Sequence, residues 1–366
     1  MSVSKKNKDV IIAAGGTGGH VFSGIAIAEE MRRADPSVRI CFAGTARGLE
    51  SSIMPKLGWP LMLVGAHSIK DKRGIRRIMA WLNVPFSIAR ALAILLSKKP
   101  SLVVSIGGYA AGPLVVAAWI LWIPVALVEP NAIPGMTNRM LGRFAKKVFI
   151  TFEQAKGFFA KKKTMLTGTP LRKEVLETTK AKPAFEKENT LFVFGGSQGA
   201  MTLNRAMIGA ASLLKDIAGG VKVIHQVGAN SDLSKIEAAY KTAGIEAEVM
   251  PFCDRIWECY EKADMVIARS GAITIAEVSA LGIPSILVPY PYAADDHQRA
   301  NAKALVNAGG AVLIEDSECT GERLAQEIAN MLGDSKNLKS MGEAAASFGK
   351  RDAAKRIADE SLKLTN

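Results

Sequence analysis

Two glycine-rich turns, each directly after a short apolar run, constrain the fold of this chain more than any other feature. The first, "GGTGG" at 15–19, follows "VIIAA", and the second, "GGSQG" at 195–199, follows "LFVF". The first turn is not a dinucleotide fingerprint, because Val21 stands where the third glycine would be, and no lysine follows to make a P-loop. A glycine turn between a strand and a helix suits phosphate groups, and its repetition indicates two similar halves.

Short apolar runs alternate with helical patterns in both halves of the chain. The runs are "VIIAAGG", "RICFAG", "LVVSIGG", "PVALVE" and "KVFIT", then, after a basic irregular stretch around 156–190, "TLFVFGGSQGA", "VKVIHQVG", "EAEVMPF", "MVIARSG" and "PSILVPY". Strands of this kind with helices between them build parallel sheets that are covered on both faces. We therefore predict an α/β protein of two Rossmann-like, doubly wound parallel-sheet domains that face each other across a cleft.

The length of 366 residues also favours two domains, with expected boundaries of 1–165 and 166–340.

The stretch from 100 to 128 has no charged residue and is long enough to span a bilayer. Glycine and proline pairs divide it, however, so a buried strand, helix and strand are favoured. The four cysteines lack metal-site spacing, and the apolar run near the start, "VII", is too short for a signal peptide, so we expect reduced thiols in a protein that stays inside the cell.

All of the excess positive charge lies in the first half. Residues 1–165 hold 24 Lys and Arg against 8 Asp and Glu, a net charge of +16, and the remainder carries −3. This asymmetry indicates an anionic partner, either nucleic acid or anionic lipid. The stretch "IKDKRGIRRIMAWLNVPF" at 69–86 has the basic and apolar residues of an interfacial helix, although a core helix with solvated arginines fits it equally. Its candidate membrane-surface residues are Arg73, Arg76, Arg77, Trp81 and Phe86.

Three further motifs point to a nucleotide-sugar ligand. In "RSGAITIAE" the Ser and Gly would begin a helix whose N–H groups suit a diphosphate, and Glu277 would accept ribose hydroxyls, although a lone helical Glu is usually solvated. Gln298 is a candidate for sugar hydroxyls, unless its proline-rich loop is simply a surface loop with a helix cap. Arg172, after "TGTPL", is a candidate diphosphate clamp. No Asp-x-Asp is present in the sequence to hold a metal on the diphosphate, so Arg172 and helix N-termini would neutralise it.

These motifs occur together in one known family. "GGTGGH", "GGY" with a following glycine, "EPNAIPG", "GTPLR", "GGSQGA", "RSGAITIAE" and "DHQ" followed by "NA" stand in the order of the MurG family, which the chain resembles over about residues 10 to 350. The resemblance implies a GT-B glycosyltransferase of peptidoglycan synthesis, and thus of cell wall biogenesis, cell shape, the cell cycle and cell division. It also implies that residues 341–366 form a helix that packs back on the N-terminal domain.

The reaction implied by the resemblance is an inverting, metal-independent transfer of N-acetylglucosamine. The donor is UDP-N-acetylglucosamine, and the acceptor is the 4-hydroxyl of undecaprenyl-diphospho-N-acetylmuramoyl-pentapeptide. No cofactor is implied. The protein would be peripheral, on the cytoplasmic side of the cell inner membrane.

Roles of single residues follow from the resemblance by position. Thr17, Gly18 and Gly19 would belong to the first loop at the cleft, and Tyr109, Glu129 and His20 would face the acceptor. Contacts to the UDP-sugar are implied for Asn131, Arg172, Ser197, Cys253, Ala272, Ile273, Thr274, Ile275, Ala276, Glu277 and Gln298. The chain departs from the common pattern of the family at Val128 and Pro130, at Ser23, where proline is frequent, and at Cys253.

His20 is our candidate for the catalytic base. An inverting transfer needs a group that takes the proton of the acceptor hydroxyl, and an imidazole has a suitable pKa near neutrality. The alternative is that His20 only hydrogen-bonds the acceptor or caps the helix.

Three other functions are open at this point. A UDP-N-acetylglucosamine 2-epimerase would share the glycine turns and the ribose Glu but would need no acceptor. A nucleic-acid-binding protein would use the basic half, but the basic residues there are interleaved with Ile and Trp, and we expect no nucleic-acid partner. An NAD-dependent dehydrogenase is opposed by the failed fingerprint.

Overall fold

The computed structural model describes residues 8–46, 48–64, 75–108, 111–178, 189–196, 198–215, 217 and 220–365, without the side chains of 75–82. The chain divides into two compact units, Met1–Arg172 with Arg351–Asn366, and Lys173–Lys350. These boundaries differ from the expected positions 165 and 340. The cleft expected between the domains stays a prediction.

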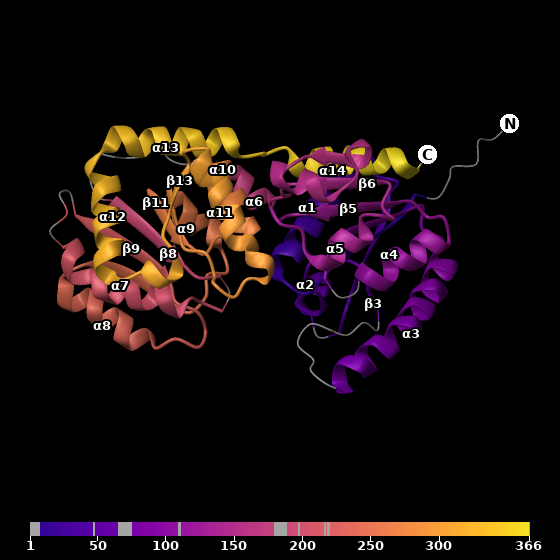
Figure 1. Ribbon diagram of the computed structural model, residues 1–366, viewed down its shortest axis with the longest axis horizontal. Helices are drawn as coiled ribbons and strands as arrows, with labels where there is room; N and C mark the ends of the chain where they lie inside the picture. The colour runs from indigo at the N-terminus through magenta and orange to yellow at the C-terminus, as the bar shows by residue number, and fades with distance from the viewer. Residues whose placement is uncertain are drawn as a thin grey trace. The chain divides into compact units, whose positions relative to one another are not determined.

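The first unit is built on a parallel sheet of seven described strands (Figure 1). They are β1 (Asp9–Ala14), β2 (Arg39–Gly44), β3 (Leu61–Leu63), β4 (Leu102–Gly107), β5 (Val125–Glu129), β6 (Lys147–Ile150) and β7 (Thr164–Leu166). Their order is β3-β2-β1-β4-β5-β6-β7. The chain thus winds outward from β1 to one edge and from β4 to the other, which is the predicted doubly wound arrangement.

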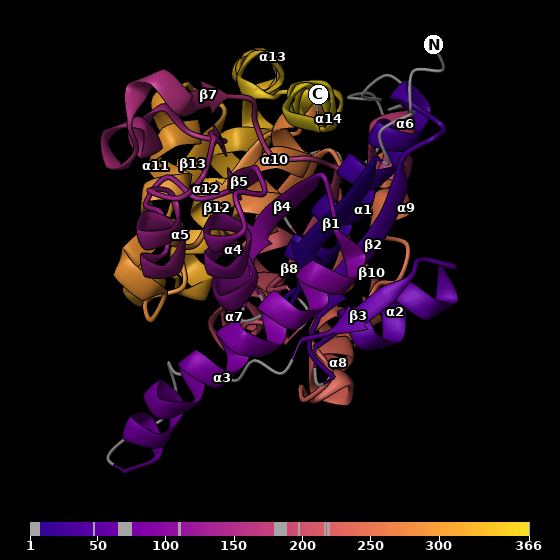
Figure 2. The same ribbon diagram turned by 90° about the vertical axis from the view of Figure 1, so that its right-hand side faces the viewer.

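Helices cover both faces of this sheet. They are α1 (Gly18–Ala34), α2 (Glu50–Lys56), α3 (Ile75–Lys98), α4 (Ala111–Ile120), α5 (Met136–Leu141) and α14 (Ala353–Leu362), with short 3-10 turns at Glu153–Phe158, Lys161–Lys163 and Lys363–Thr365. Val10 and Ile12 of β1 pack with α1 and α14, whereas the alternate residues Ile11 and Ala13 pack with α3, α4 and α5. Figure 2 shows that the N-terminal end of α3 extends beyond the sheet.

The second unit repeats the plan with six described parallel strands. They are β8 (Asn189–Phe194), β9 (Val221–Gln226), β10 (Glu246–Met250), β11 (Met265–Ala268), β12 (Ser285–Leu287) and β13 (Ala311–Leu313). The order β10-β9-β8-β11-β12-β13 is again doubly wound, with β8 in the place of β1 and β11 in the place of β4.

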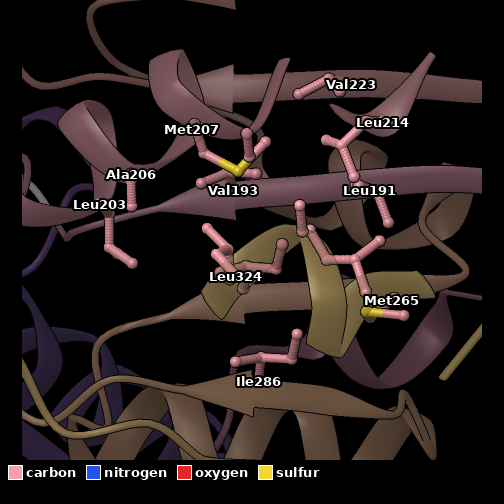
Figure 3. Packing of buried hydrophobic residues seen from close by; sticks show 14 of the residues in the cluster. Leu191, Val193, Leu203, Ala206, Met207, Leu214, Val223, Met265, Ile286 and Leu324 are labelled. Atoms are coloured by element: carbon pink, nitrogen blue, oxygen red, sulfur yellow. The ribbon is translucent and has the colours of Figure 1, made fainter. Parts of the chain in front are cut away.

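Apolar side chains also cover both faces of the second sheet. Its helices are α6 (Lys173–Glu177), α7 (Met201–Leu214), α8 (Leu233–Ala243), α9 (Ile256–Lys262), α10 (Ala272–Leu281), α11 (His297–Asn307), α12 (Gly321–Gly333) and α13 (Ser335–Phe348), with 3-10 turns at Ala294–Asp296 and Asp316–Glu318. Figure 3 shows Val193 of β8 packed with Met207 of α7 and Leu324 of α12. On the other face, the ring of Phe192 meets Tyr260 of α9 edge-on, with 5.5 Å between ring centres.

Most of the predicted strands are confirmed, and the differences lie at edges and ends. The uncharged stretch 100–128 forms β4, α4 and β5, as predicted. Within the described residues, no helix is both long and apolar enough to cross a membrane. The edge strands β3, β7 and β13, each three residues long, were not predicted. The expected single helix over 341–366 is divided, since α13 belongs to the second unit and α14 packs on α1 of the first.

The packing of α1 on the first sheet predicts opposite effects for two Gly→Ala substitutions. A Cβ at Gly24 of α1 would lie 2.7 Å from the Cβ of Ala14, whereas one at Gly112 of α4 would have no described atom within 4 Å apart from its chain neighbours and the backbone of its own helix. We expect Gly24→Ala to lower the free energy of unfolding by about 1–3 kcal/mol, because the core must move to admit a methyl group. Gly112→Ala should raise it by up to about 1 kcal/mol through helix propensity. Urea unfolding measures both, and equal effects would contradict the packing described.

Candidate functional site

In each sheet one pair of central strands marks the point where the winding reverses, between β1 and β4 and between β8 and β11. Ligands of doubly wound sheets bind outside the carboxyl ends of the strands at this point. In the first unit these ends carry the Gly15 turn and Gly107-Gly108, and in the second they carry the Gly195 turn and the segment 269–271. The predicted motifs therefore lie where the topology expects a ligand in each unit.

His20 lies in the first turn of α1, directly after the first glycine turn. Thr17 caps this helix, and its hydroxyl accepts a hydrogen bond from the N–H of His20 at 3.5 Å. The residue as a whole is partly exposed, and Nδ1 of its ring lies 3.2 Å from the carbonyl oxygen of Gly15. Burial lowers the pKa of His20, while the Gly15 carbonyl and the charge of Glu50 act in the opposite direction. A neutral imidazole at neutral pH is the result.

The end of β4 lies beside the His20 ring because the pairing of β4 with β1 is irregular there. The register between β1 and β4 shifts so that Ala14 pairs with Gly107. Gly107 and Gly108 have φ angles of 128° and 89°, which favour glycine. A Cβ at Gly107 would lie 3.2 Å from Cε1 of His20, and one at Gly108 would overlap the backbone of Gly15. The two loops at the switch point are therefore in close backbone contact, with the His20 ring beside them.

Glu50 belongs to this site, although no motif singled it out. It is 1% exposed and accepts a hydrogen bond from the N–H of Gly16 at 3.1 Å. A single glutamate after "TARGL" has no spacing relative to another polar residue. The only available signal was the group of glycines in "GGTGG" and "TARGLE", which leave room for its carboxyl.

Glu129, which was expected to face the acceptor, holds the loop after β5. Its side chain is 1% exposed. Its Oε1 accepts hydrogen bonds from the backbone N–H and the side-chain amide of Asn131, at 2.9 and 3.2 Å, and its Oε2 accepts one from Asn138 at 2.9 Å. Burial raises the pKa of Glu129 to about 7, against the effect of these hydrogen bonds. The carboxyl thus fixes the position of Asn131, one of the predicted donor contacts.

Arg172 ends the segment after β7, and α1 holds this segment in place. The guanidinium of Arg172 lies 4.3 Å from the centre of the Phe22 ring. The hydroxyl of Ser23 donates to the carbonyl oxygen of Pro170 at 2.9 Å. A proline at position 23, frequent in the family resembled, could not donate this bond. The departure at Ser23 therefore has a structural role in fixing the chain before Arg172.

In the second unit, the N-terminus of α10 is joined to the start of α11. Gly271 is the N-cap of α10, as predicted. The hydroxyl of Ser270 donates to the backbone carbonyl of Gln298 at 2.8 Å. The side-chain oxygen of Gln298 accepts from the N–H of Tyr290 at 3.0 Å, and Asn301 donates to the carbonyl of Ser270 at 3.3 Å. The structure thus brings Gln298 to the helix end where a diphosphate was predicted.

The predicted donor segment of α10 divides into buried and accessible residues. Glu277 is 3% exposed, and its Oε2 accepts a hydrogen bond from the hydroxyl of Tyr260 at 2.8 Å. Ile275 is fully buried in the core and Ala272 nearly so, whereas Ile273, Thr274 and Ala276 are partly exposed. Of the predicted contacts in this helix, Ile273, Thr274 and Ala276 are therefore the ones accessible to a ligand.

Arg269, just before this helix, has a structural role that sequence reasoning missed. It is 9% exposed, donates to the carbonyl oxygens of Val288 and Pro289 at 3.1 and 3.0 Å, and pairs with Asp316 at 2.5 Å. These bonds tie the loop after β12 to the start of α10. An arginine at the end of a buried strand was the available signal.

The remaining predicted residues are only partly covered by the structure. Cys253 is half-buried, with its Sγ 3.1 Å from that of Cys259, and both thiols are free. Phe86 of α3 is 75% exposed. Arg76, Arg77 and Trp81 lie in α3, but their side chains are outside the described part of the chain. Ser197, Tyr109 and Arg73 lie outside the described residues altogether.

Comparisons with known proteins agree with this geometry. The model of the glycosyltransferase family 28 N-terminal domain matches residues 10–150, and that of the family 28 C-terminal domain matches residues 190–357. A relative from Myxococcus xanthus (strain DK1622), named UDP-N-acetylglucosamine--N-acetylmuramyl-(pentapeptide) pyrophosphoryl-undecaprenol N-acetylglucosamine transferase, is 42% identical over 355 residues, which are 97% of this chain and 92% of the relative.

Solved structures show the same relationship. The crystal structure of MurG from Acinetobacter baumannii has a TM-score of 0.80 and 30% identity, covering 97% of this chain and 99% of that one. A UDP-N-acetylglucosamine 2-epimerase has a TM-score of 0.71 at 16% identity, covering 98% of this chain and 96% of that one, which shows a shared fold alone. The family models and the relatives together show that the chain is a glycosyltransferase and belongs to the MurG family within glycosyltransferase family 28.

Proposed function

We propose that the chain transfers N-acetylglucosamine from UDP-N-acetylglucosamine to the 4-hydroxyl of muramoyl-pentapeptide carried on undecaprenyl diphosphate, a step of peptidoglycan synthesis. The name of its Myxococcus xanthus relative describes this donor sugar and this acceptor. The observation that carries the proposal in the structure itself is the hydrogen bond between Nδ1 of His20 and the Gly15 carbonyl at the switch point of the first sheet.

This hydrogen bond suits His20 for the role of base. A carbonyl oxygen can only accept, so Nδ1 of the neutral ring carries the proton and Nε2 has the lone pair. Nε2 would take the proton of the acceptor hydroxyl while the hydroxyl oxygen attacks the anomeric carbon of the donor. The bond from that carbon to the phosphate oxygen breaks, its electron pair leaves with UDP, and the configuration is inverted. The lowered pKa of His20 keeps the ring unprotonated and ready for this step near neutral pH.

Groups of the protein would stabilise the negative charge of the departing UDP. Arg172, Ser197 and the N-terminus of α10 are the groups we assign to the diphosphate, because a guanidinium and free helical N–H groups both stabilise phosphate oxygens. The cation–π contact with Phe22 supports a fixed position for the Arg172 side chain. Metal independence is part of this proposal.

The nucleoside and the sugar would be bound by residues of the second unit and of the loop after β5. We assign the ribose to Glu277, whose carboxyl Tyr260 holds in place, and the sugar hydroxyls to Gln298 and Asn131. Cys253 would contact the uracil through its backbone. Glu129 would hold Asn131 through two hydrogen bonds, and its predicted contact with the acceptor stays part of the proposal.

We also propose that the protein works at the cytoplasmic face of an anionic membrane, where its lipid-linked acceptor is held. The first unit carries the excess positive charge, and Phe86 of α3 exposes 75% of its surface. Apolar exposure extends to α4, where Trp119 is 53% exposed, and to Trp122 after it, at 91%. Exposed aromatic residues with basic flanks suit an interfacial surface.

UDP release tests the proposed reaction. UDP-N-acetylglucosamine is supplied in EDTA with and without a short-chain lipid-linked muramoyl-pentapeptide, and released UDP is measured. We expect release only with the acceptor and an undiminished rate in EDTA, because the groups assigned to the diphosphate belong to the protein. His20→Ala should reduce the rate by about 100-fold or more, the usual contribution of a positioned base.

Other outcomes would each remove a part of the proposal. Consumption of the donor without acceptor would favour the epimerase, and loss of the rate in EDTA would contradict metal independence. Near-wild-type turnover of His20→Ala across the pH range would rule out the role of base. No turnover with either substrate set would contradict the proposed donor and acceptor.

The burial of Glu129 predicts a pH-dependent effect of Glu129→Gln on stability. The pKa of the carboxyl is about 7 in the folded chain against 4.5 as its ordinary value, so between these values the folded state binds more protons than the unfolded state. The stabilising contribution of Glu129 is therefore complete below pH 4.5 and is lost as pH rises through 7. Gln does not titrate, so the difference in unfolding free energy, wild type minus variant, should fall by up to about 3 kcal/mol over this window. A difference that is constant with pH in urea titrations would refute this.

Vesicle binding tests the membrane surface. Arg76→Glu with Phe86→Ser should weaken co-sedimentation with vesicles of phosphatidylglycerol by about tenfold or more, since one charge is reversed and one exposed ring is lost. Tyr292→Ser is the matched control, because Tyr292 is 82% exposed but belongs to the second unit. Equal binding of the double variant and the control would remove this surface from the proposal.

A further inference from the structure

A buried carboxylate touches the glycine turn that precedes His20. Glu50 is the first residue of α2 and is 1% exposed. Its Oε2 accepts from the N–H of Gly16 at 3.1 Å, and its Oε1 accepts from the N–H and the hydroxyl of Thr45 at 2.7 and 3.2 Å. Three donors satisfy this carboxylate and hold it in one place.

The surrounding glycines make room for this side chain. A Cβ added at Gly15, Gly44 or Gly48 would overlap atoms of the Glu50 side chain. Gly15 belongs to the turn that was interpreted as a phosphate loop. Its lack of a side chain is therefore explained by the buried carboxyl as well as by any ligand.

A single peptide group connects Glu50 with His20. The N–H of the peptide between Gly15 and Gly16 donates to Glu50, and the C=O of the same peptide accepts from Nδ1 of His20 at 3.2 Å. Hydrogen bonds in such a chain polarise one another. A negative charge at the N–H end of the peptide makes its carbonyl oxygen a stronger acceptor for the imidazole N–H.

We propose that Glu50 is a positioning residue for His20. Through the Gly15–Gly16 peptide, Glu50 fixes the Nδ1–H tautomer of the His20 ring and makes Nε2 more basic. This inference rests on the proposed function, in which Nε2 takes the proton of the acceptor hydroxyl. In that step the O–H bond breaks, an N–H bond forms at Nε2, and Nδ1 keeps its proton. Glu50 gains and loses no proton and touches no substrate; its charge stabilises the imidazolium that forms.

The other groups that face the His20 ring do not replace this charge. Gly107 of β4 lies against Cε1, Thr17 caps the backbone, and Gly15 contributes its carbonyl, all of them uncharged. Among the described residues, the negative charge of Glu50 raises the pKa of His20, while burial lowers it by a larger amount. Loss of the carboxylate should therefore lower this pKa further.

Titration of His20 by NMR tests the inference without reference to turnover. The chain has four histidines, so with ¹⁵N-labelled imidazole rings His20 is assigned by the signal lost in His20→Gln. We expect the neutral ring of the wild type to be protonated at Nδ1. In Glu50→Gln the pKa should fall by about half a unit or more, and a second tautomer should appear. An Nε2–H tautomer in the wild type, or an unchanged pKa and tautomer in folded Glu50→Gln, would overturn the inference.

Thr45→Val is the matched control. It removes one hydrogen bond to the same carboxyl but keeps the charge of Glu50 and the bond from Gly16, so the pKa of His20 should move by less than about 0.2 units. A shift as large as that of Glu50→Gln would mean that any disturbance of α2 moves the ring, and would overturn the role of the charge. If Glu50→Gln does not fold, an Nε2–H tautomer in the wild type would still overturn the inference.

The pH profile of turnover separates this inference from the proposed function. In Glu50→Gln, kcat should fall by about tenfold or more, and the acid limb of the profile should move to lower pH. A purely structural role would lower the rate without moving the limb in that direction. Full activity of His20→Ala would defeat the role of base even where the NMR coupling is present. A loss of activity in His20→Ala together with an unmoved His20 signal in Glu50→Gln would defeat the role of Glu50 and leave the proposed reaction intact.

Discussion

Parallel pairing of β1 with β4, and of β8 with β11, is the constraint on which both candidate sites depend. Each pair joins strands far apart in sequence and brings their carboxyl ends to one edge of the sheet. In the first unit this places Gly107 beside the His20 ring, and in the second it places the start of α10 after β11 beside the turn after β8. The polar groups are arranged around these two points, and the apolar residues of alternate register hold each sheet between its helices.

The fold could be predicted because its signals are long or repeated. Apolar runs of five or six residues and a repeated glycine turn are enough to indicate two doubly wound sheets. The edge strands of three residues were missed, since so short a run shows no period. The equally short β12 was found because prolines bound its run in "PSILVPY". The boundary at Lys350 could not be found either, because the amphipathic pattern of α14 shows that one face is buried but not which unit buries it.

The site was predictable where a motif implies a backbone shape, and less so where a single side chain is used. The glycine turn implied a helix start, and His20 is found there with Thr17 as its cap. Lone glutamates in sequence are usually solvated, but Glu50, Glu129 and Glu277 are each 3% exposed or less. Their partners differ in kind: for Glu50 two backbone N–H groups and a threonine hydroxyl, for Glu129 two asparagines, and for Glu277 a tyrosine hydroxyl. Burial of a carboxyl is decided by such partners, and no spacing in the sequence shows them.

The two similar glycine turns have different neighbours in their units, so the repeat in the sequence does not predict what each turn contacts. In the first unit the turn contacts the loop after β4, where Gly108 lies against the backbone of Gly15, so the contact crosses the switch point. In the second unit Gly199 lies against Val227 and Gly228, after the neighbouring strand β9. The second turn therefore contacts the end of β9, while its own strand β8 pairs with β11. The first turn holds a titratable ring beside a contact between two loops, while its counterpart meets the loop after β9. A repeated motif thus indicates the shape of the backbone turn but not the neighbours that the turn contacts.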